Sequence, residues 1–440
     1  MEQKNKKKIS TQTIIKLLLA VVLLGLSAFL LKGDVWTFWT WWLLAGVMGF
    51  AAMPVTGRLF WRFEDKGWIS SKVLAIAATG FLTWFLTAIR LIPFNALTCA
   101  AVTILCAVIC FFLLRKESKE KTECFPVDRI SLIYWEELLF FLAFLMWTYL
   151  AGFRPAAYGT EKFMDYGFME AMMRSTTFPA RDLWYSEGHI NYYYGGQYFA
   201  VFLTKLSHTK VELTYNLMRT FVAGLAFAMP FSLVYQMMSD RMKGQQKSEK
   251  VIKGLPFAAG FTAGTAVSIA GNIHYVIYAQ IIPLIEKLTG KEVSSYWFPD
   301  ATRYIGYNPY REEDRTIHEF PCYSFVLGDL HAHVINVFLV LTVLGILYSW
   351  MKTNSGKSWR QKEIGLLGLL LGMFLFSNTW DFMIYYVVIC GTLLLGNLKR
   401  YSSDPFISQA LKWSVIQWGE LLTVAFLASL PFHLTFQNVM

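Results

Sequence analysis

Charged residues are scarce in this chain: they make up 16% of its 440 residues, whereas hydrophobic residues make up 55%. Soluble domains average about 25% charged and about 45–50% apolar residues. Cysteine is also scarce, with 6 residues, which excludes a disulfide scaffold. A disordered chain is excluded too, because so much apolar surface does not stay in contact with water. The composition therefore favours a polytopic membrane protein over a soluble enzyme.

Apolar runs of about 20 residues, the length that crosses a bilayer as a helix, recur along the chain. They predict an all-α polytopic membrane protein with about 11–12 transmembrane helices. Residues 192–206 are a doubtful span, because this run is short and contains Gly195 and Gly196. The other expected spans lie near 13–31, 36–54, 70–89, 95–114, 131–152, 216–238, 255–277, 334–351, 363–378, 381–398 and 418–437.

The basic residues indicate an orientation. If residues 192–206 do not cross, every dense cluster of Lys and Arg falls on one side, which the positive-inside rule assigns to the cytoplasm together with the N-terminus. Residues 192–206 are then re-entrant or interfacial, and the long loops 153–215 and 278–333 face the exoplasmic side. The net charge of +10 is then a topology signal, with membrane lipids and not nucleic acid as the partner. We expect a multi-pass protein of the cell membrane.

Polar chemistry is unevenly distributed along the chain. Residues 1–129 hold four expected spans and short loops, so we interpret them as an N-terminal membrane unit. Residues 130–440 carry the long loops and form the expected functional core. The sequence stops soon after a span, which suggests truncation at the C-terminus.

The first long loop contains an expected amphipathic helix, because apolar residues recur there at three- and four-residue steps. Glu161 and Asp165 share one face at its start, where the helix dipole stabilises a carboxylate. They are candidates for a general base or a metal ligand, and helix capping is the alternative. Arg174 and Arg181 follow, and their forked donors suit a phosphate, although lone loop arginines are solvated more often than not.

An aromatic segment, NYYYGGQ, follows this helix. Its polar and aromatic side chains could bind a sugar by stacking and hydrogen bonding, and an interfacial aromatic belt is the alternative. The candidate substrate-binding residues here are Asn191, Tyr192, Tyr193, Tyr194 and Gln197.

The second long loop holds the strongest metal-ligand pattern. In an extended segment, Asp329, His331 and His333 would face the same way, as ligands of a divalent metal do. Phosphate binding and proton transfer are the other roles open to them. His318 and Glu319, upstream, are candidate substrate-binding residues.

A third polar motif, NTWD, interrupts the apolar runs near the C-terminus. Asn378 is a candidate substrate-binding residue and Asp381 a candidate catalytic acid or base. An ionisable residue at the end of a span is a functional candidate if it faces a cavity, and a helix cap otherwise.

Three motifs, NYYYGGQ at 191–197, HEFPCYSFVLGDLHAH at 318–333 and NTWDF at 378–382, resemble the uncharacterised YYY membrane-protein family of bacteria and archaea. This family commonly has Pro between the two histidines, where this chain has Ala332. The layout also resembles that of GT-C integral-membrane glycosyltransferases, with an acidic residue early in the first exoplasmic loop, then an interfacial helix and an aromatic segment.

The GT-C resemblance implies a glycosyltransferase that uses a polyprenyl-phosphate sugar donor on the exoplasmic face. Asp165 would be the general base, and Arg174, Arg181 or a metal would stabilise the leaving phosphate. The alternatives are a transporter or flippase of a lipid or polar solute, and a metal-dependent membrane hydrolase.

Overall fold

The computed structural model describes residues 10–120, 124–245, 249–303, 305, 310, 313–353, 361–403 and 407–437. Helices dominate, and within these ranges no strand occurs. Eight helical stretches are long and apolar enough to cross a membrane, and one of them, Thr11–Leu59, contains two successive helices. The predicted all-α polytopic membrane fold is therefore confirmed, while its GT-C-like arrangement stays a prediction.

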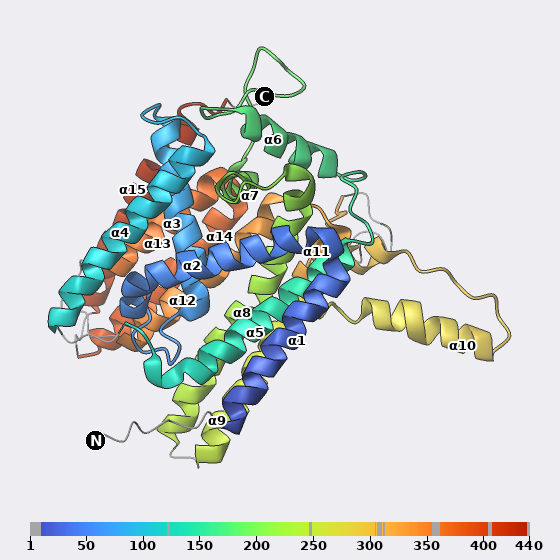
Figure 1. The fold of residues 1–440 in the computed structure, drawn as a ribbon, viewed down its shortest axis with the longest axis horizontal. Helices are drawn as coiled ribbons and strands as arrows, with labels where there is room; N and C mark the ends of the chain where they lie inside the picture. The colour runs from blue at the N-terminus through green and yellow to red at the C-terminus, as the bar shows by residue number, and fades with distance from the viewer. Residues whose placement is uncertain are drawn as a thin grey trace, which may run out of the picture.

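The long helices form a bundle (Figure 1). Short polar segments separate them at both ends, because each apolar run ends where charged or turn-forming residues begin. The long helices are α1 (Thr11–Leu31), α2 (Val35–Leu59), α3 (Trp68–Ala88), α4 (Ala96–Glu120), α5 (Ile130–Ala151), α8 (Val211–Gly244), α9 (Glu249–Ser268), α12 (Ala332–Thr353), α13 (Lys362–Ser377), α14 (Thr379–Arg400) and α15 (Ser408–His433).

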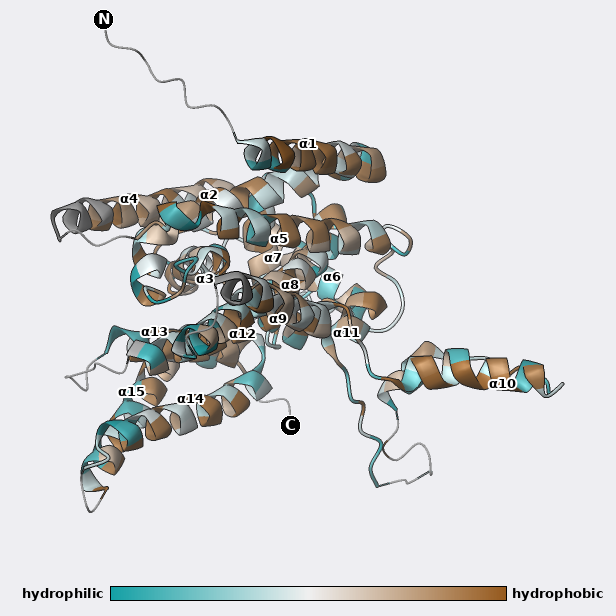
Figure 2. Cartoon of the chain, turned by 90° about the horizontal axis from the view of Figure 1, so that it is seen from below, coloured by the Kyte–Doolittle hydropathy of each residue, from teal (hydrophilic) through white to brown (hydrophobic). Residues whose placement is uncertain are grey.

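Shorter helices lie in the two long loops. Helix α6 crosses one end of the bundle, and α10 projects sideways from it in both views (Figures 1 and 2). The amphipathic helix expected in the first loop is present as α6, and it ends at Arg174. The short helices are α6 (Lys162–Arg174), α7 (Gly195–Leu206), α10 (Ile282–Leu288) and α11 (Pro321–Leu327), with 3-10 turns at Lys32–Asp34, Val127–Arg129 and Phe298–Thr302 and a π-helical turn at Val276–Ile281.

Helix α7 forms most of the doubtful span, residues 192–206, and its length shows why this segment does not cross the membrane as a helix. Its 12 residues extend about 18 Å, which is too short to cross a hydrocarbon core of about 30 Å. Its two first residues are glycines because the neighbouring helices come close. A Cβ on Gly195 would lie 2.4 Å from the Phe376 ring, and one on Gly196 would lie 2.9 Å from Ile335. The chain therefore buries α7 against α12 and α13.

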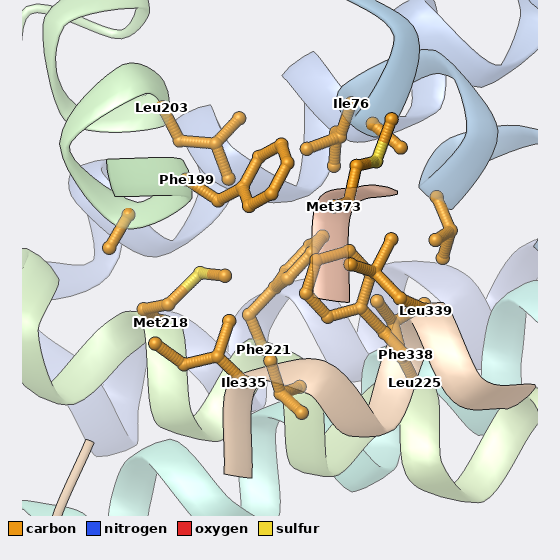
Figure 3. Close-up of a cluster of buried hydrophobic side chains, with 14 of the residues drawn as sticks. Ile76, Phe199, Leu203, Met218, Phe221, Leu225, Ile335, Phe338, Leu339 and Met373 are labelled. Atoms are coloured by element: carbon orange, nitrogen blue, oxygen red, sulfur yellow. The ribbon is translucent and has the colours of Figure 1, made fainter. Parts of the chain in front are cut away.

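One hydrophobic core surrounds α7. Side chains from α3, α7, α8, α12 and α13 meet there, among them Ile76, Phe199, Phe221, Phe338 and Met373 (Figure 3). Because α3 and α7 share this core, the expected N-terminal unit packs directly against the rest of the chain. The boundary at residue 129 stays a prediction.

Ion pairs gather at the end of the bundle opposite α6. Glu64, after α2, lies 2.6 Å from the Lys243 ammonium and 3.4 Å from the Arg129 guanidinium. Lys352, in the last turn of α12, lies 3.1 Å from the Asp240 carboxylate. The loop after α2, the start of α5 and the ends of α8 and α12 therefore meet at this end.

Candidate functional site

Four segments meet at the α6 end of the bundle. They are residues 160–165 at the start of α6, the first turn of α7, residues 319–333 around α11, and the first turn of α14. The start of α6 is polar, and its remaining positions are largely apolar and buried, so burial of the helix places its first turn beside the loop before α12. The polar residues of both long loops therefore lie together.

Asp165 is the most buried acid of this group, with 1% of its surface exposed. The Gln197 amide donates to its Oδ1 at 2.8 Å and to the Leu330 carbonyl at 3.1 Å. No described residue hydrogen-bonds to the other oxygen, Oδ2. Burial raises the pKa of Asp165 to about 6, although His331 and the Gln197 hydrogen bond favour its charged form. A carboxylate with one free oxygen and this pKa can accept a proton near neutral pH.

Glu161 and His331 form an ion pair beside Asp165. The Nε2 atom of His331 lies 2.8 Å from the Glu161 carboxylate. Burial alone would lower the pKa of His331, but the negative charges of Asp165, Glu161 and Asp329 outweigh it, so the pKa is raised. The structure thus brings together three predicted residues from two segments that are about 170 residues apart in the sequence.

Glu319 joins the two histidines in a group that suits a metal ion. The ligand atoms of Glu319, His331 and His333 all lie within 4.8 Å of one another. His333 Nε2 is 3.0 Å from the Glu319 carboxylate, and the Ser324 hydroxyl donates to the same oxygen at 3.0 Å. Burial raises the pKa of Glu319, but these contacts outweigh it and hold the pKa below its usual value. One carboxylate and two imidazoles form a donor set typical of zinc and other transition metals.

Asp329, the third residue of the predicted metal motif, contacts a different partner. Its Oδ1 accepts a hydrogen bond from Thr160 at 2.5 Å, and its Oδ2 lies 3.9 Å from His331 Nδ1. The extended segment that would align Asp329 with both histidines ends at His331, because α12 begins at Ala332. His333 therefore turns toward Glu319, which the sequence had suggested as a substrate-binding residue. Metal binding by Asp329, His331 and His333 stays a prediction.

Two basic residues that the sequence analysis missed lie beside Asp329. Gly328 has a φ of +91°, and a Cβ there would lie 1.9 Å from Arg219 Nη1 and 3.3 Å from Lys162 Nζ. Burial lowers the pKa of Lys162, while the charge of Asp329 opposes this. Arg219 is an arginine within an apolar run, a signal that could have identified it.

Asp381 and Asn378 lie at the start of α14. The amides of Asn336 and Asn378 donate to Asp381 Oδ2 at 2.9 and 3.0 Å. Asp381 is also within electrostatic range of His333. The NTWD motif is therefore connected to the candidate metal group through His333, and only indirectly to Asp165.

The remaining predicted residues lie away from Asp165. Arg174 is the last residue of α6, nine positions after Asp165, and Arg181 lies in the loop that follows. The amide of Asn191 contacts the backbone of Gln437, and His318 contacts the backbone of Thr302.

The three tyrosines of the NYYYGGQ motif have different surroundings: Tyr192 and Tyr193 contact each other, whereas Tyr194 lies in the aromatic core. The Tyr192 hydroxyl donates to Tyr193 at 3.0 Å, and the Tyr192 ring lies 5.9 Å from Phe168 of α6. Tyr194 is buried and accepts a hydrogen bond from the Trp84 indole at 3.2 Å, so it belongs to the aromatic core.

Comparison with known protein families assigns the chain to one of them. Residues 78–440 match the family described as uncharacterized membrane protein (DUF2298). The chain belongs to this family. The predicted family membership is thereby confirmed, and every site residue of this DUF2298 protein lies within the matched range. No curated protein and no solved structure matches the chain.

Proposed function

We propose that this DUF2298 protein is a membrane glycosyltransferase that transfers a sugar from a polyprenyl-phosphate donor to an acceptor on the exoplasmic face. The observation that carries this proposal is the position of Asp165. A buried carboxylate with one unpartnered oxygen and a pKa of about 6 lies beside the Glu161–His331 pair. A general base for an acceptor hydroxyl needs this combination of a free acceptor atom and a pKa near neutrality.

The reaction is an inverting displacement at the anomeric carbon of the donor sugar. The acceptor oxygen forms a bond to this carbon while the bond from the carbon to the phosphate oxygen breaks. The bonding electron pair leaves with the phosphate, and the acceptor proton passes to Asp165 Oδ2. His331, positively charged when protonated, stabilises the ionised form of Asp165 before the transfer.

The leaving phosphate has two sources of stabilisation at this centre. Lys162 and Arg219 both approach Gly328, and no described carboxylate lies within 4.0 Å of their nitrogens. A divalent metal held by Glu319, His331 and His333 would supply Lewis-acid stabilisation of the same negative charge. Lys162 lies in the first turn of α6 with Asp165, and Arg219 interacts electrostatically with the neighbouring Asp329, whereas Arg174 lies at the other end of α6. Lys162 and Arg219 therefore replace Arg174 and Arg181 in this role.

An apolar groove in the helix bundle supports a lipid-linked donor. A cavity of about 520 Å³ lies between α2, α3, α4 and α13, lined by side chains such as Met48, Leu74, Ile104 and Met373. Helix α13 leads from this cavity to Asn378, next to Asp381. An isoprenoid chain buried in such a cavity would gain about 25 cal/mol per Å² of apolar surface.

The charged residues at the ends of the helices support an exoplasmic location. The described ion pairs of Arg129, Lys243 and Lys352 lie at the end opposite α6. Basic residues flanking membrane helices are enriched on the cytoplasmic side. The reaction centre at the α6 end then faces outward.

The experiment compares cells that carry the wild-type chain or Asp165→Asn as their sole copy. Polyprenyl-phosphate-linked sugars are extracted and quantified by mass spectrometry. Asp165→Asn should slow turnover by about 10²–10⁴-fold and cause the donor to accumulate, because a general base contributes about this much. Glu187→Gln, which removes an exposed carboxylate in the same loop, is the matched control and should leave the donor pool unchanged. Equal donor pools in wild type and Asp165→Asn would refute the proposal.

A metal-dependent hydrolase is the second candidate, because Glu319, His331 and His333 form a metal-type donor set. In that case a metal-activated water, and not an acceptor hydroxyl, would attack the substrate. Metal analysis of the purified protein tests this function. No bound metal and no effect of a chelator on the substrate pools would exclude it.

A transporter or flippase is the third candidate, favoured by ionisable residues buried between the membrane helices. Glu136 has no exposed surface, and no described residue hydrogen-bonds to either of its carboxyl oxygens. Such residues are typical of translocation paths. Reconstituted liposomes would show lipid or solute flux that Glu136→Gln abolishes and Asp165→Asn spares.

A further inference from the structure

A polar cavity lies at the other end of α6 from Asp165. Its volume is about 460 Å³, and Arg174, Arg181, His189, Ser175 and Thr177 are among its lining residues. Arg174 is the last residue of α6, and the other residues belong to the loop and hairpin that follow. We refer to this cavity as the arginine pocket.

Buried apolar side chains fix the frame of the arginine pocket. Phe178, Ala180 and Ile190 are each 3% exposed or less, and the Phe178 ring stacks against Tyr194 with centroids 5.8 Å apart. The amide of Ile190 donates to the Ala180 carbonyl at 2.9 Å, next to the antiparallel bridge between the backbones of Arg181 and His189. The polar residues therefore project from a backbone that the core holds in place.

The arginine pocket has an excess of positive charge. Its one carboxylate, Asp182, already accepts hydrogen bonds from the amides of Trp184 at 2.7 Å and Tyr185 at 2.9 Å. Among the described residues, no carboxylate lies within 4.0 Å of the guanidinium nitrogens of Arg174 or Arg181. Two exposed guanidinium groups without an ion-pair partner among the described residues line this cavity, and their charge and forked donors suit an oxyanion. The Ser175 hydroxyl already donates to the Thr177 carbonyl at 2.6 Å, so the two arginines are the main donors.

The arginine pocket is separate from the reaction centre. Nine residues of α6 separate Asp165 from Arg174, which corresponds to about 13 Å along the helix axis. The hairpin of residues 181–189 nevertheless packs along α6. Trp184 of this hairpin lies against Gly167 of α6, because a Cβ on Gly167 would be 2.8 Å from the Trp184 ring. A ligand anchored in the pocket could therefore extend along the hairpin toward Asp165.

We propose that the arginine pocket binds a phosphate group carried by the acceptor. This proposal rests on the proposed glycosyltransferase function, and it assigns to the acceptor the two arginines that the sequence suggested for the donor. The phosphate belongs to a water-soluble or glycan acceptor, because the hairpin extends beyond the end of the helix bundle (Figure 1). A headgroup of a membrane lipid would offer the same chemistry, and the experiment separates these two sources.

The experiment measures binding of inorganic phosphate and glycerol phosphate to the purified full chain in nanodiscs of zwitterionic lipid. All titrations use the Lys162→Gln background with a chelator, so that binding at the reaction centre is reduced. Arg174→Gln and Arg181→Gln should each weaken binding by about tenfold, because a hydrogen bond to a charged group contributes this much. Arg90→Gln, which removes an exposed arginine outside the pocket, is the matched control and should bind as the unsubstituted background does.

Three outcomes would overturn the proposal. They are no phosphate binding by the Lys162→Gln background, unchanged binding by Arg174→Gln and Arg181→Gln together, and competition by phosphatidylglycerol added to the nanodiscs. The last outcome would assign the pocket to a lipid headgroup. Asp165→Asn should still bind phosphate, because Asp165 lies outside the pocket. Donor pools that are equal in wild type and Asp165→Asn, together with phosphate binding that depends on Arg174 and Arg181, would count against the proposed function alone.

Discussion

The two ends of the helix bundle both contain buried ionisable residues, but they differ in how these residues are satisfied. At the end opposite α6, Glu137 accepts hydrogen bonds from the Trp42 indole at 2.7 Å and the Trp68 indole at 2.9 Å. It also pairs with the buried Lys72 ammonium at 2.9 Å. This arrangement is closed, because the protein itself supplies the partners that burial requires.

At the α6 end the arrangement is open. Asp165 keeps one oxygen without a described partner, and Lys162 and Arg219 lie beside Gly328 without a described carboxylate within 4.0 Å. Unsatisfied buried groups cost free energy, which a ligand can recover when it binds. The comparison indicates that one end of the bundle serves stability and the other binding. Glu136, without a described hydrogen-bond partner, is an exception at the closed end.

The largest expected effect is on stability at the closed end. Lys72→Met should lower the free energy of unfolding by about 3–5 kcal/mol, because it leaves Glu137 as a partly buried charge without its cation. Asp165→Asn should not lower it, because it removes a charge whose burial is unfavourable. Denaturant unfolding in detergent measures both variants, with Lys72→Met/Glu137→Gln as the control that restores part of the loss. Equal destabilisation by Lys72→Met and Asp165→Asn would remove the distinction between the two ends.

The pH dependence of the open end should be the next largest effect. Asp165 must be ionised to accept a proton, so turnover should fall about tenfold per pH unit below about 6. The contribution of Asp165 to folding stability changes with pH in the opposite direction. The folded pKa is raised from 3.8, so the folded state binds more protons, and the contribution of Asp165 to stability is lost as the pH rises from about 4 to 6. A turnover that stays constant down to pH 5, or an Asp165→Asn variant with the same pH-dependent unfolding as wild type, would contradict this assignment.

The smallest effect concerns the Glu161–His331 pair. Glu161→Gln should lower the pKa of His331 only slightly, because the Glu161 carboxylate is 59% exposed and solvent screens its charge. Titration of the histidine ring by nuclear magnetic resonance measures this pKa. Glu187→Gln is the control, and a His331 pKa that does not change in Glu161→Gln would show that the pair is too weak to tune the site.

Much of the fold could be predicted from local sequence. The apolar runs predicted the long helices, and the three- and four-residue spacing of Phe163, Tyr166, Met169 and Met173 predicted α6. These predictions succeeded because helix formation and membrane insertion depend on residues close in the sequence. The distribution of Lys and Arg predicted that the short segment 192–206 does not cross the membrane, and its helix α7 has only 12 residues.

The composition of the candidate site could be predicted only in part. The sequence indicated Asp165, His331 and Glu161 as functional candidates, and the fold brings them together. The sequence also grouped Arg174 and Arg181 with these residues. In the structure, α6 separates Asp165 in its first turn from Arg174 at its last residue, and Arg181 lies in the loop beyond. The sequence analysis missed Lys162, which follows Glu161 directly and therefore looked like an ordinary solvated residue.

The sequence by itself determined that this protein is a helical membrane protein in which most of the candidate site acids and histidines lie in two loops. Only the tertiary structure decided which of them become partners. Glu161 and His331 are 170 residues apart, and Thr160 and Asp329 are 169 residues apart. The pairing of Glu319 with His333 depends on where α12 begins, and the approach of Arg219 to Gly328 depends on how α8 packs. Such contacts follow from the packing of whole helices, which no local pattern encodes.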